Sequence, residues 1–271
     1  MPHPSEHPVP PDVWATGDAY EAFIGRWSRR VARTFLAWLG VPADAAWLDV
    51  GCGTGALAAT ILETSRPRSV TGVDPSDGFV AHAHRAIPDA RVSFHVGDAR
   101  SLPVADGSFD AVVSGLALNF VPEPDRAVAE MARSCRPGGV VAAYVWDYAG
   151  RMEMLRRFWD AAVALDPSAA PLDEGPRFPL CREGALADLF SRAPLRDVAT
   201  RAIDVTTRFR SFDDYWAPFL GGQGPAPTYV ASLEAEAREA LRERLRRSLP
   251  ANPDGSIRLT ARAWAARGVR A

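Results

Sequence analysis

Five short apolar segments alternate with amphipathic ones in residues 46–146 of this 271-residue chain. The apolar segments, rich in β-branched residues, are Trp47–Val50, Ser69–Val73, Val92–Val96, Ala111–Ser114 and Val140–Trp146. The segments between them include Ala56–Leu62, Gly78–Ala86 and Asp125–Cys135. Apolar strands separated by helices are typical of a parallel sheet whose two faces are both covered. The sequence therefore predicts an α/β fold with a Rossmann-like, doubly wound, mostly parallel sheet.

The rest of the chain divides into four further segments. Residues 1–16 contain five prolines and are predicted to form a loose arm before a core domain at 17–150. Residues 151–210 are predicted to form a variable helical segment that ends in a strand, and residues 250–271 to form the final strand of the sheet. Residues 211–249 lie between those two strands, which predicts a helical cap inserted between the last two strands.

The predicted cap carries an aromatic cluster and a long charged helix. The cluster can form either a buried core or the wall of a substrate pocket; its members are Phe212, Tyr215, Trp216 and Phe219. The helical stretch EAEAREALRERLRR alternates acidic and basic residues, which is typical of a solvated helix face rather than of a nucleic-acid patch. Because ligands bind at the carboxyl ends of the strands in such sheets, we expect the cap to cover an acceptor site there.

Charge and residue types exclude several classes of function. The 31 basic and 33 acidic residues give a net charge of -2, so the chain has no overall attraction to nucleic acid or anionic lipid. All the basic residues are arginine, which excludes a Schiff-base lysine and a phosphate-loop lysine. The three scattered cysteines and the absence of a leader-like or membrane-spanning apolar stretch predict a cytoplasmic protein with no membrane insertion.

The segment WLDVGCGTGALAATIL, residues 47–62, carries the strongest functional signal. A predicted strand ends at Val50, a glycine loop follows, and a helix begins. Such a loop lets a ligand approach the main chain closely. The loop alone is ambiguous, because Gly51, Gly53 and Ala56 also satisfy the dinucleotide pattern G-x-G-x-x-A.

Three aspartates at successive strand ends separate the two interpretations. Asp49 precedes the glycine loop, where a carboxylate attracts a cationic amine and repels a pyrophosphate. Asp74 ends the next strand, where an acidic side chain binds ribose hydroxyls, although it can also simply cap the following helix. Asp98 follows the third strand and is suited to an adenine amino group. The series fits a ligand that contains an amino acid, a ribose and an adenine.

With these residues the chain resembles the class I S-adenosylmethionine-dependent methyltransferases, in the ubiquinone/menaquinone-biosynthesis-like (methyltransferase type 11) group. The matching stretches are LDVGCGTG, VTGVDPS, VGDARSLPVADGSFDAVVS and MARSCRPGGVVAAYVW, in that order within residues 47–146. The resemblance implies S-adenosylmethionine as cofactor and a small organic molecule as methyl acceptor. It implies cofactor contacts from Asp49, Gly51, Gly53, Asp74, Pro75, Asp98 and Ala99, and from Tyr20 on a helix that closes over the methionine end.

The acceptor side is less determined. Many relatives carry a histidine near the end of the fourth strand, but this chain reads GLALNFV there, so the resemblance implies no histidine base. Asn119, Asp147 and Tyr148 follow the fourth and fifth strands and are the candidates for orienting the acceptor. The histidines and cysteines show no metal-ligand spacing, so we expect no metal, and Cys52 reads as a small space-filling residue.

Two alternatives to methyl transfer remain open from the sequence. A nicotinamide-dependent oxidoreductase would place a pyrophosphate over the glycine loop, beside the unfavourable Asp49. A protein of the same fold that binds the cofactor without transferring its methyl group would keep the same cofactor residues. Nucleic acid is not expected as a partner, because the chain lacks basic residues interleaved with aromatic ones.

Overall fold

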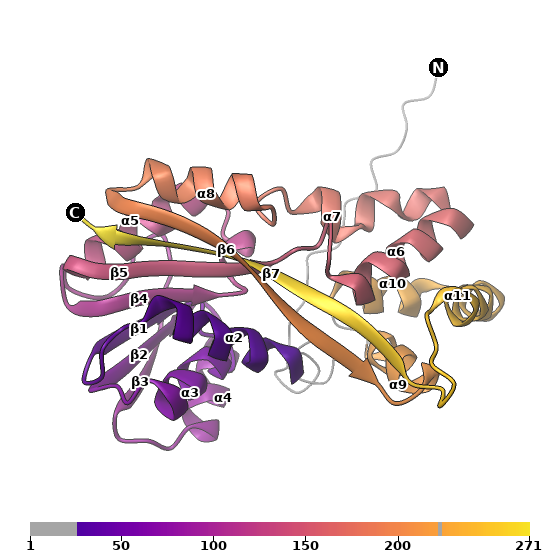
Figure 1. Ribbon diagram of the computed structural model, residues 1–271, viewed down its shortest axis with the longest axis horizontal. Coiled ribbons are helices and arrows are strands. Elements are labelled where there is room, and N and C mark those ends of the chain that lie inside the picture. Colours follow the sequence, from indigo (N-terminus) through magenta and orange to yellow (C-terminus); the bar gives the residue numbers. More distant parts are fainter. Residues whose placement is uncertain (1–25, 222–223) are drawn as a thin grey trace.

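The computed structural model describes residues 26–221 and 224–271, and its central element is a seven-stranded sheet. The strands lie in the order β3-β2-β1-β4-β5-β7-β6. β1 to β5 are parallel, and β7 is antiparallel to both of its neighbours. The predicted mostly parallel, doubly wound sheet is confirmed (Figure 1). The bounds are β1 Ala46–Val50, β2 Ser69–Asp74, β3 Val92–Val96, β4 Phe109–Gly115, β5 Cys135–Trp146, β6 Leu195–Phe209 and β7 Ile257–Arg270.

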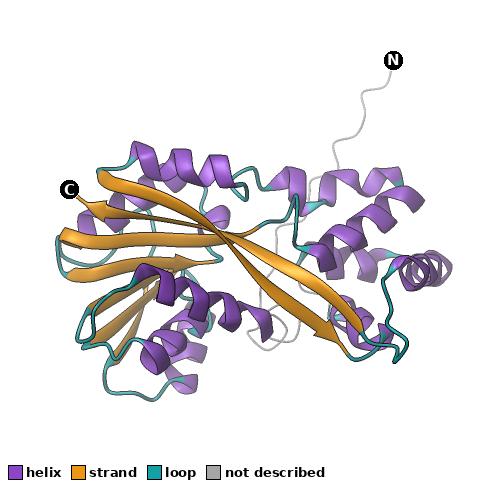
Figure 2. Cartoon of the chain, viewed as in Figure 1, coloured by secondary structure: helices purple, strands orange, loops and turns teal. Residues whose placement is uncertain are grey.

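Helices cover both faces of the sheet (Figures 1 and 2). One face carries α2 (Arg26–Leu39), α3 (Ala56–Thr64) and α4 (Asp77–Ala86), and the other carries α5 (Pro124–Ser134) and α8 (Glu183–Arg192). All residues of β1 are buried, as expected for a central strand with helices on both faces. The predicted arm at residues 1–16 and Tyr20 lie outside the described residues.

The last two strands extend beyond the rest of the sheet. β6 pairs with β7 along nearly its whole length, but β5 pairs only with the Ala263–Val269 part of β7. The earlier part of β7 instead contacts the chain that follows β5, since the Asp147 N–H donates to the Arg262 carbonyl at 2.9 Å. The β6–β7 pair therefore projects past the carboxyl ends of the parallel strands and carries helices at its far end (Figure 1).

The helices beyond this edge come from two parts of the chain. The segment after β5 supplies α6 (Glu153–Leu165), a 3₁₀ turn at Pro167–Leu172 and α7 (Glu174–Arg177). The segment between β6 and β7 supplies α9 (Phe212–Trp216), a 3₁₀ turn at Ala217–Leu220, α10 (Pro225–Ser232) and α11 (Ala235–Ser248). We call these two segments together the helical extension. α11 packs on α6, so the two segments form one packed unit.

The aromatic cluster forms the core of this helical extension. The Phe219 ring stacks on Phe158 of α6 with centroids 4.5 Å apart and planes 10° from parallel. The Tyr215 hydroxyl donates to the Met154 carbonyl at 3.0 Å. Tyr215 and Phe219 are fully buried, and Phe212 and Trp216 nearly so. Of the two alternatives for these residues, the contacts support a buried core.

Truncation of a ring in this core should destabilise the protein. Phe219→Ala removes a fully buried aromatic ring, and such changes cost about 3–5 kcal/mol. Leu220→Ala is the matched control, because the adjacent Leu220 is 57% exposed and should cost under about 0.5 kcal/mol. Urea unfolding followed by tryptophan fluorescence measures both. Equal free energies of unfolding for the two variants would contradict the assignment of Phe219 to a core.

Candidate functional site

A cavity of about 470 Å³ lies at the carboxyl ends of β1 to β4. It lies where the strand order reverses between β1 and β4, which is where open α/β sheets bind their ligands. Every predicted cofactor-binding residue in the described part of the chain lines this cavity: Asp49, Gly51, Gly53, Asp74, Pro75, Asp98 and Ala99. The structure thus brings together residues that are up to 50 positions apart in the sequence.

The glycine loop is held between the ends of two neighbouring strands. The N–H groups of Gly51 and Cys52 both donate to the carbonyl of Val73, at 2.8 and 3.1 Å. Gly51 has φ +72°, and a Cβ there would lie 2.4 Å from the Cβ of Ala117. Only glycine therefore fits this position without displacing the chain that follows β4. The loop is in this way fixed close to the floor of the cavity.

Asp74 connects the glycine loop to the start of α4. One carboxylate oxygen accepts from the Gly53 N–H and the other from the Ser76 N–H, each at 2.9 Å. Burial raises the pKa of Asp74, and these two backbone donors act in the opposite direction. Each carboxylate oxygen has a second lone pair, so two neighbouring hydroxyls of a ligand can still donate to it. Asp74 therefore has both a structural role in the loop and the capacity to bind a diol.

Asp49 is the most unusual charged group of the site. Its side chain is 1% exposed, and neither carboxylate oxygen has a hydrogen-bond partner among the described residues. Burial, and secondly the nearby Asp74 carboxylate, raise the pKa of Asp49 to about 7, while the Ala58 N–H dipole acts in the opposite direction. A buried carboxylate without a partner is costly. The site is therefore prepared for a ligand that brings a positive charge or hydrogen-bond donors.

Asp98 lines the same cavity, and its side chain is 46% exposed. It accepts from the Arg100 N–H at 2.8 Å and forms an ion pair with the Arg100 guanidinium at 2.6 Å. The hydrogen bonds from the Arg100 side chain are the main reason that the pKa of Asp98 lies low, at about 2. Asp98 is therefore ionised at any pH near neutrality. The Arg100 Nε–H is shared between its two oxygens and an Nη–H donates to one of them, which leaves one lone-pair site for an amino group.

The three candidates for the acceptor side do not line this cavity. Asp147 closes the turn after β5, where it accepts from the Arg151 N–H at 2.9 Å. Tyr148 is buried against the Phe178 ring, 5.6 Å away. Asn119 lies in a 3₁₀ turn between Leu118 and Phe120, and its buried amide nitrogen has no partner among the described residues. For Asp147 and Tyr148 the geometry indicates structural roles, whereas a role of Asn119 stays a prediction.

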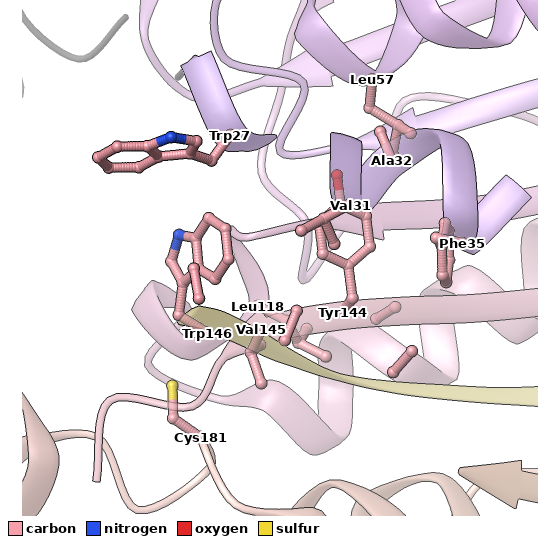
Figure 3. Close-up of a cluster of buried hydrophobic side chains, with 14 of the residues drawn as sticks. Trp27, Val31, Ala32, Phe35, Leu57, Leu118, Tyr144, Val145, Trp146 and Cys181 are labelled. Atoms are coloured by element: carbon pink, nitrogen blue, oxygen red, sulfur yellow. The ribbon is translucent and has the colours of Figure 1, made fainter. Parts of the chain in front are cut away.

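Sequence reasoning missed the residues that close the other end of the cavity. The cavity is lined there by Ser28 and Ala32 of α2, by Leu118 of the 3₁₀ turn that follows β4, and by Tyr144 of β5. Figure 3 shows Ala32, Leu57, Leu118 and Tyr144 gathered in one cluster, with Trp27 and Trp146 beside them. A helical stripe in the sequence marked α2 as buried, but only the packing of α2 across β5 shows which of its residues reach the cavity.

The described parts of the chain contain neither a cluster of metal-ligating residues nor a helix that is long and apolar enough to cross a membrane. Cys52 is a buried residue of the glycine loop, and its burial, with Asp49 and Asp74 nearby, raises the pKa of its thiol. A thiol held in its protonated form is a poor nucleophile. This agrees with Cys52 as a space-filling residue.

Residues 48–143, which contain the glycine loop and the strand ends just described, match the family model of a methyltransferase domain. Residues 48–143 therefore form a methyltransferase domain. The matched region begins in β1 and ends in β5, and it includes all seven predicted cofactor residues of the described part of the chain. The recognition made from the sequence motifs is thereby confirmed at the level of the family.

Relatives and solved structures agree with this assignment. The chain is 29% identical to the trans-aconitate 2-methyltransferase of Variovorax paradoxus, over 62% of this chain and 64% of that protein. It is 38% identical to the demethylmenaquinone methyltransferase of Renibacterium salmoninarum, over 43% and 48%. It is also similar to the structure of phosphoethanolamine N-methyltransferase 2 of Haemonchus contortus in complex with S-adenosyl-L-methionine (TM-score 0.59, 18% identity, 93% of this chain and 56% of that one).

The chain spans about three-fifths of the length of the curated relatives that it matches, 59% for the first of them. The likeness to the solved structure, at 18% identity, concerns the fold. The helical extension lies outside residues 48–143.

The charge of Asp49 should strengthen cofactor binding and lower the free energy of unfolding of the ligand-free protein. Asp49→Asn removes the charge and keeps the size of the side chain. The unfolded chain loses the Asp49 proton near pH 4, but the folded chain keeps it until about pH 7. Stability therefore falls as the pH rises through this window. Since one pKa unit corresponds to about 1.4 kcal/mol, the variant should be more stable than the wild type by roughly 1–4 kcal/mol at pH 8.

The same variant should bind S-adenosylmethionine more weakly, and the wild-type affinity should decrease as the pH falls below 7. Thermal unfolding at pH 5 and pH 8, with calorimetric titration at pH 6 and pH 8, measures both effects. A variant that is less stable at pH 8 and binds the cofactor like the wild type would show that Asp49 is a structural group.

Loss of the Asp74 carboxylate should weaken cofactor binding at least about tenfold. Charge-assisted hydrogen bonds are worth roughly 1.5–3 kcal/mol each, and Asp74→Asn removes one acceptor oxygen and the charge. Asp110→Asn is the matched control, because Asp110 also accepts from a backbone N–H, that of Ala46 at 2.7 Å, but does not line the cavity. Calorimetric titration of both variants with S-adenosylhomocysteine measures the two affinities. Equal affinity losses in the two variants would refute a direct role of Asp74.

Proposed function

We propose that this protein is an S-adenosylmethionine-dependent methyltransferase that transfers the methyl group to a small organic acceptor by in-line displacement. The observation that carries the proposal is the buried Asp49 carboxylate, which has no hydrogen-bond partner among the described residues and lines the cavity beside the glycine loop. A cationic ligand compensates this charge. A dinucleotide would instead place its pyrophosphate close to it, which disfavours the oxidoreductase alternative.

The other strand-end residues fit the remaining parts of the cofactor. Asp74 retains free lone pairs for the ribose hydroxyls, and the ionised Asp98 is available to the adenine amino group. In the glycine loop, a Cβ at Gly53 would meet no atom within 4 Å, so a ligand has room to approach the main chain closely there. These assignments extend the family's roles to the residues of this chain that match its motifs.

When bound, S-adenosylmethionine supplies an already activated methyl group on a positively charged sulfur. The protein's part is to hold the acceptor in line with that group and to exclude water, which contributes about 7–11 kcal/mol when the geometry is good. The apolar end of the cavity, formed by Ala32, Leu118 and Tyr144, is suited to excluding water. A strong general base is not required for acidic phenols, carboxylates or enolates.

We place the acceptor near Phe120 rather than beside the Phe212–Phe219 cluster. Phe120 lines the cavity and is 39% exposed, and its ring contacts that of Phe178 at 5.1 Å. The segment that ends at Phe178 therefore reaches the mouth of the cavity, whereas the four aromatic residues of the α9 region do not line it. A net charge of -2 further favours a small molecule over nucleic acid as acceptor.

Transfer of a labelled methyl group tests the proposal. The protein is incubated with S-adenosylmethionine labelled in the methyl group and a pool of small metabolites, and label is followed into acceptors and S-adenosylhomocysteine is quantified. We expect both products to form in equal amounts. Saturable binding of S-adenosylmethionine without either product would indicate the alternative of a binding protein that does not methylate. Binding of NAD in its place would refute the cofactor assignment.

A further inference from the structure

The same short ion-paired turn occurs at both ends of β3. Before the strand, Asp89 accepts from the Arg91 N–H at 2.9 Å and pairs with the Arg91 guanidinium at 2.7 Å. After the strand, Asp98 accepts from the Arg100 N–H at 2.8 Å and pairs with its guanidinium at 2.6 Å. The local geometry is the same, so any difference in role comes from what surrounds each turn.

Arg100 makes a second ion pair that reaches a different loop. Its other guanidinium nitrogen lies 3.0 Å from the carboxylate of Glu123, which precedes α5. Arg100 and Asp98 line the cavity, whereas Arg91 and Asp89 do not. Arg100 therefore contacts the carboxylate of Asp98 in its own loop and that of Glu123, which follows Arg100 by 23 residues and lies in a different loop.

These two loops both line the cavity. The loop after β3 contributes residues 97–100, and the loop before α5 contributes Val121 and Pro122. The guanidinium of Arg100 connects the two loops, and its planar shape allows it to hold both carboxylates at once. One side chain thus bridges two loops of the cavity lining.

The ion pairs of Arg100 contribute little to the stability of the fold. The side chains of Arg100, Asp98 and Glu123 are 34%, 46% and 55% exposed, and ion pairs exposed to this extent contribute little to folding. Their effect should instead appear in the cavity itself, where they fix the direction of the Asp98 carboxylate and the position of the loop that carries Pro122.

We propose that Arg100 is a positioning residue for the cofactor: its guanidinium clasps the two loops around the adenine end of the cavity and aims the Asp98 carboxylate at the adenine amino group. The inference rests on the proposed cofactor site. It assigns two separable effects, because the pair with Glu123 holds the two loops together and the pair with Asp98 orients the group that recognises the amino group.

The test uses three variants of the full chain and two ligands. Dissociation constants and dissociation rates are measured for S-adenosylhomocysteine and for S-inosylhomocysteine, which has a carbonyl oxygen in place of the adenine amino group. Arg100→Gln should weaken S-adenosylhomocysteine binding about tenfold, mostly through faster dissociation, and should reduce the preference over S-inosylhomocysteine. Glu123→Gln should weaken both ligands about threefold and keep the preference. Arg91→Gln, the matched control, should change neither.

Combining Arg100→Gln with Glu123→Gln should weaken S-adenosylhomocysteine binding little beyond Arg100→Gln alone, because the two changes break a shared interaction. Wild-type affinity of Arg100→Gln for both ligands would overturn the inference. So would an equal loss for both ligands accompanied by a lowered melting temperature, which would indicate a general structural role. A wild-type protein that fails to bind S-adenosylhomocysteine would instead refute the proposed function on which the inference rests.

Discussion

A buried negative charge without a partner, on Asp49, is the constraint on which the site depends. The end of β1 is covered by the glycine loop, by the chain after β4 and by α2, so water cannot solvate this carboxylate well. The pKa of about 7 expresses the cost of that position. A group held at such a cost is a functional candidate when it lines a cavity. Here it makes the free protein less stable and prepares it for a cationic ligand.

The other strand ends arrange the site around this charge. Asp74 ties the glycine loop to α4 through two backbone hydrogen bonds, so the loop is ordered before a ligand arrives. Asp98 accepts from the Arg100 guanidinium as well as from a backbone N–H, and that guanidinium extends to the loop before α5. Three carboxylates, each at or next to the carboxyl end of a strand, thus have three different environments. Each environment suits a different part of one ligand.

The sequence was sufficient for the sheet and the glycine loop because their signals are local. Strand-length apolar runs, a glycine loop and an aspartate at a strand end lie within a few residues of each other. The contributions of Ser28, Ala32 and Tyr144 were out of reach, because they depend on how α2 lies across β5. The same reason explains Asp147 and Tyr148. They follow β5 as expected, but the turn after the strand directs them to Arg151 and Phe178.

The aromatic residues of the α9 region show why composition alone does not assign a role. Large apolar side chains suit a pocket wall and a core equally well, and only the presence of Phe158 on α6, across from Phe219, decides between them. α6 and α9 come from different parts of the chain, so no local sequence pattern predicts their contact. By contrast, Phe178 had no distinguishing signal in the sequence and yet reaches Phe120 at the cavity.

Calorimetric titration with S-adenosylmethionine and with NAD, each at pH 8 and pH 6, decides whether the cavity holds a cationic adenosyl ligand next to an ionised Asp49. We expect S-adenosylmethionine to bind at one site and more tightly at pH 8 than at pH 6, since protonation of Asp49 removes the compensating charge. We expect no saturable binding of NAD. Binding of NAD without binding of S-adenosylmethionine would refute a cationic ligand beside Asp49.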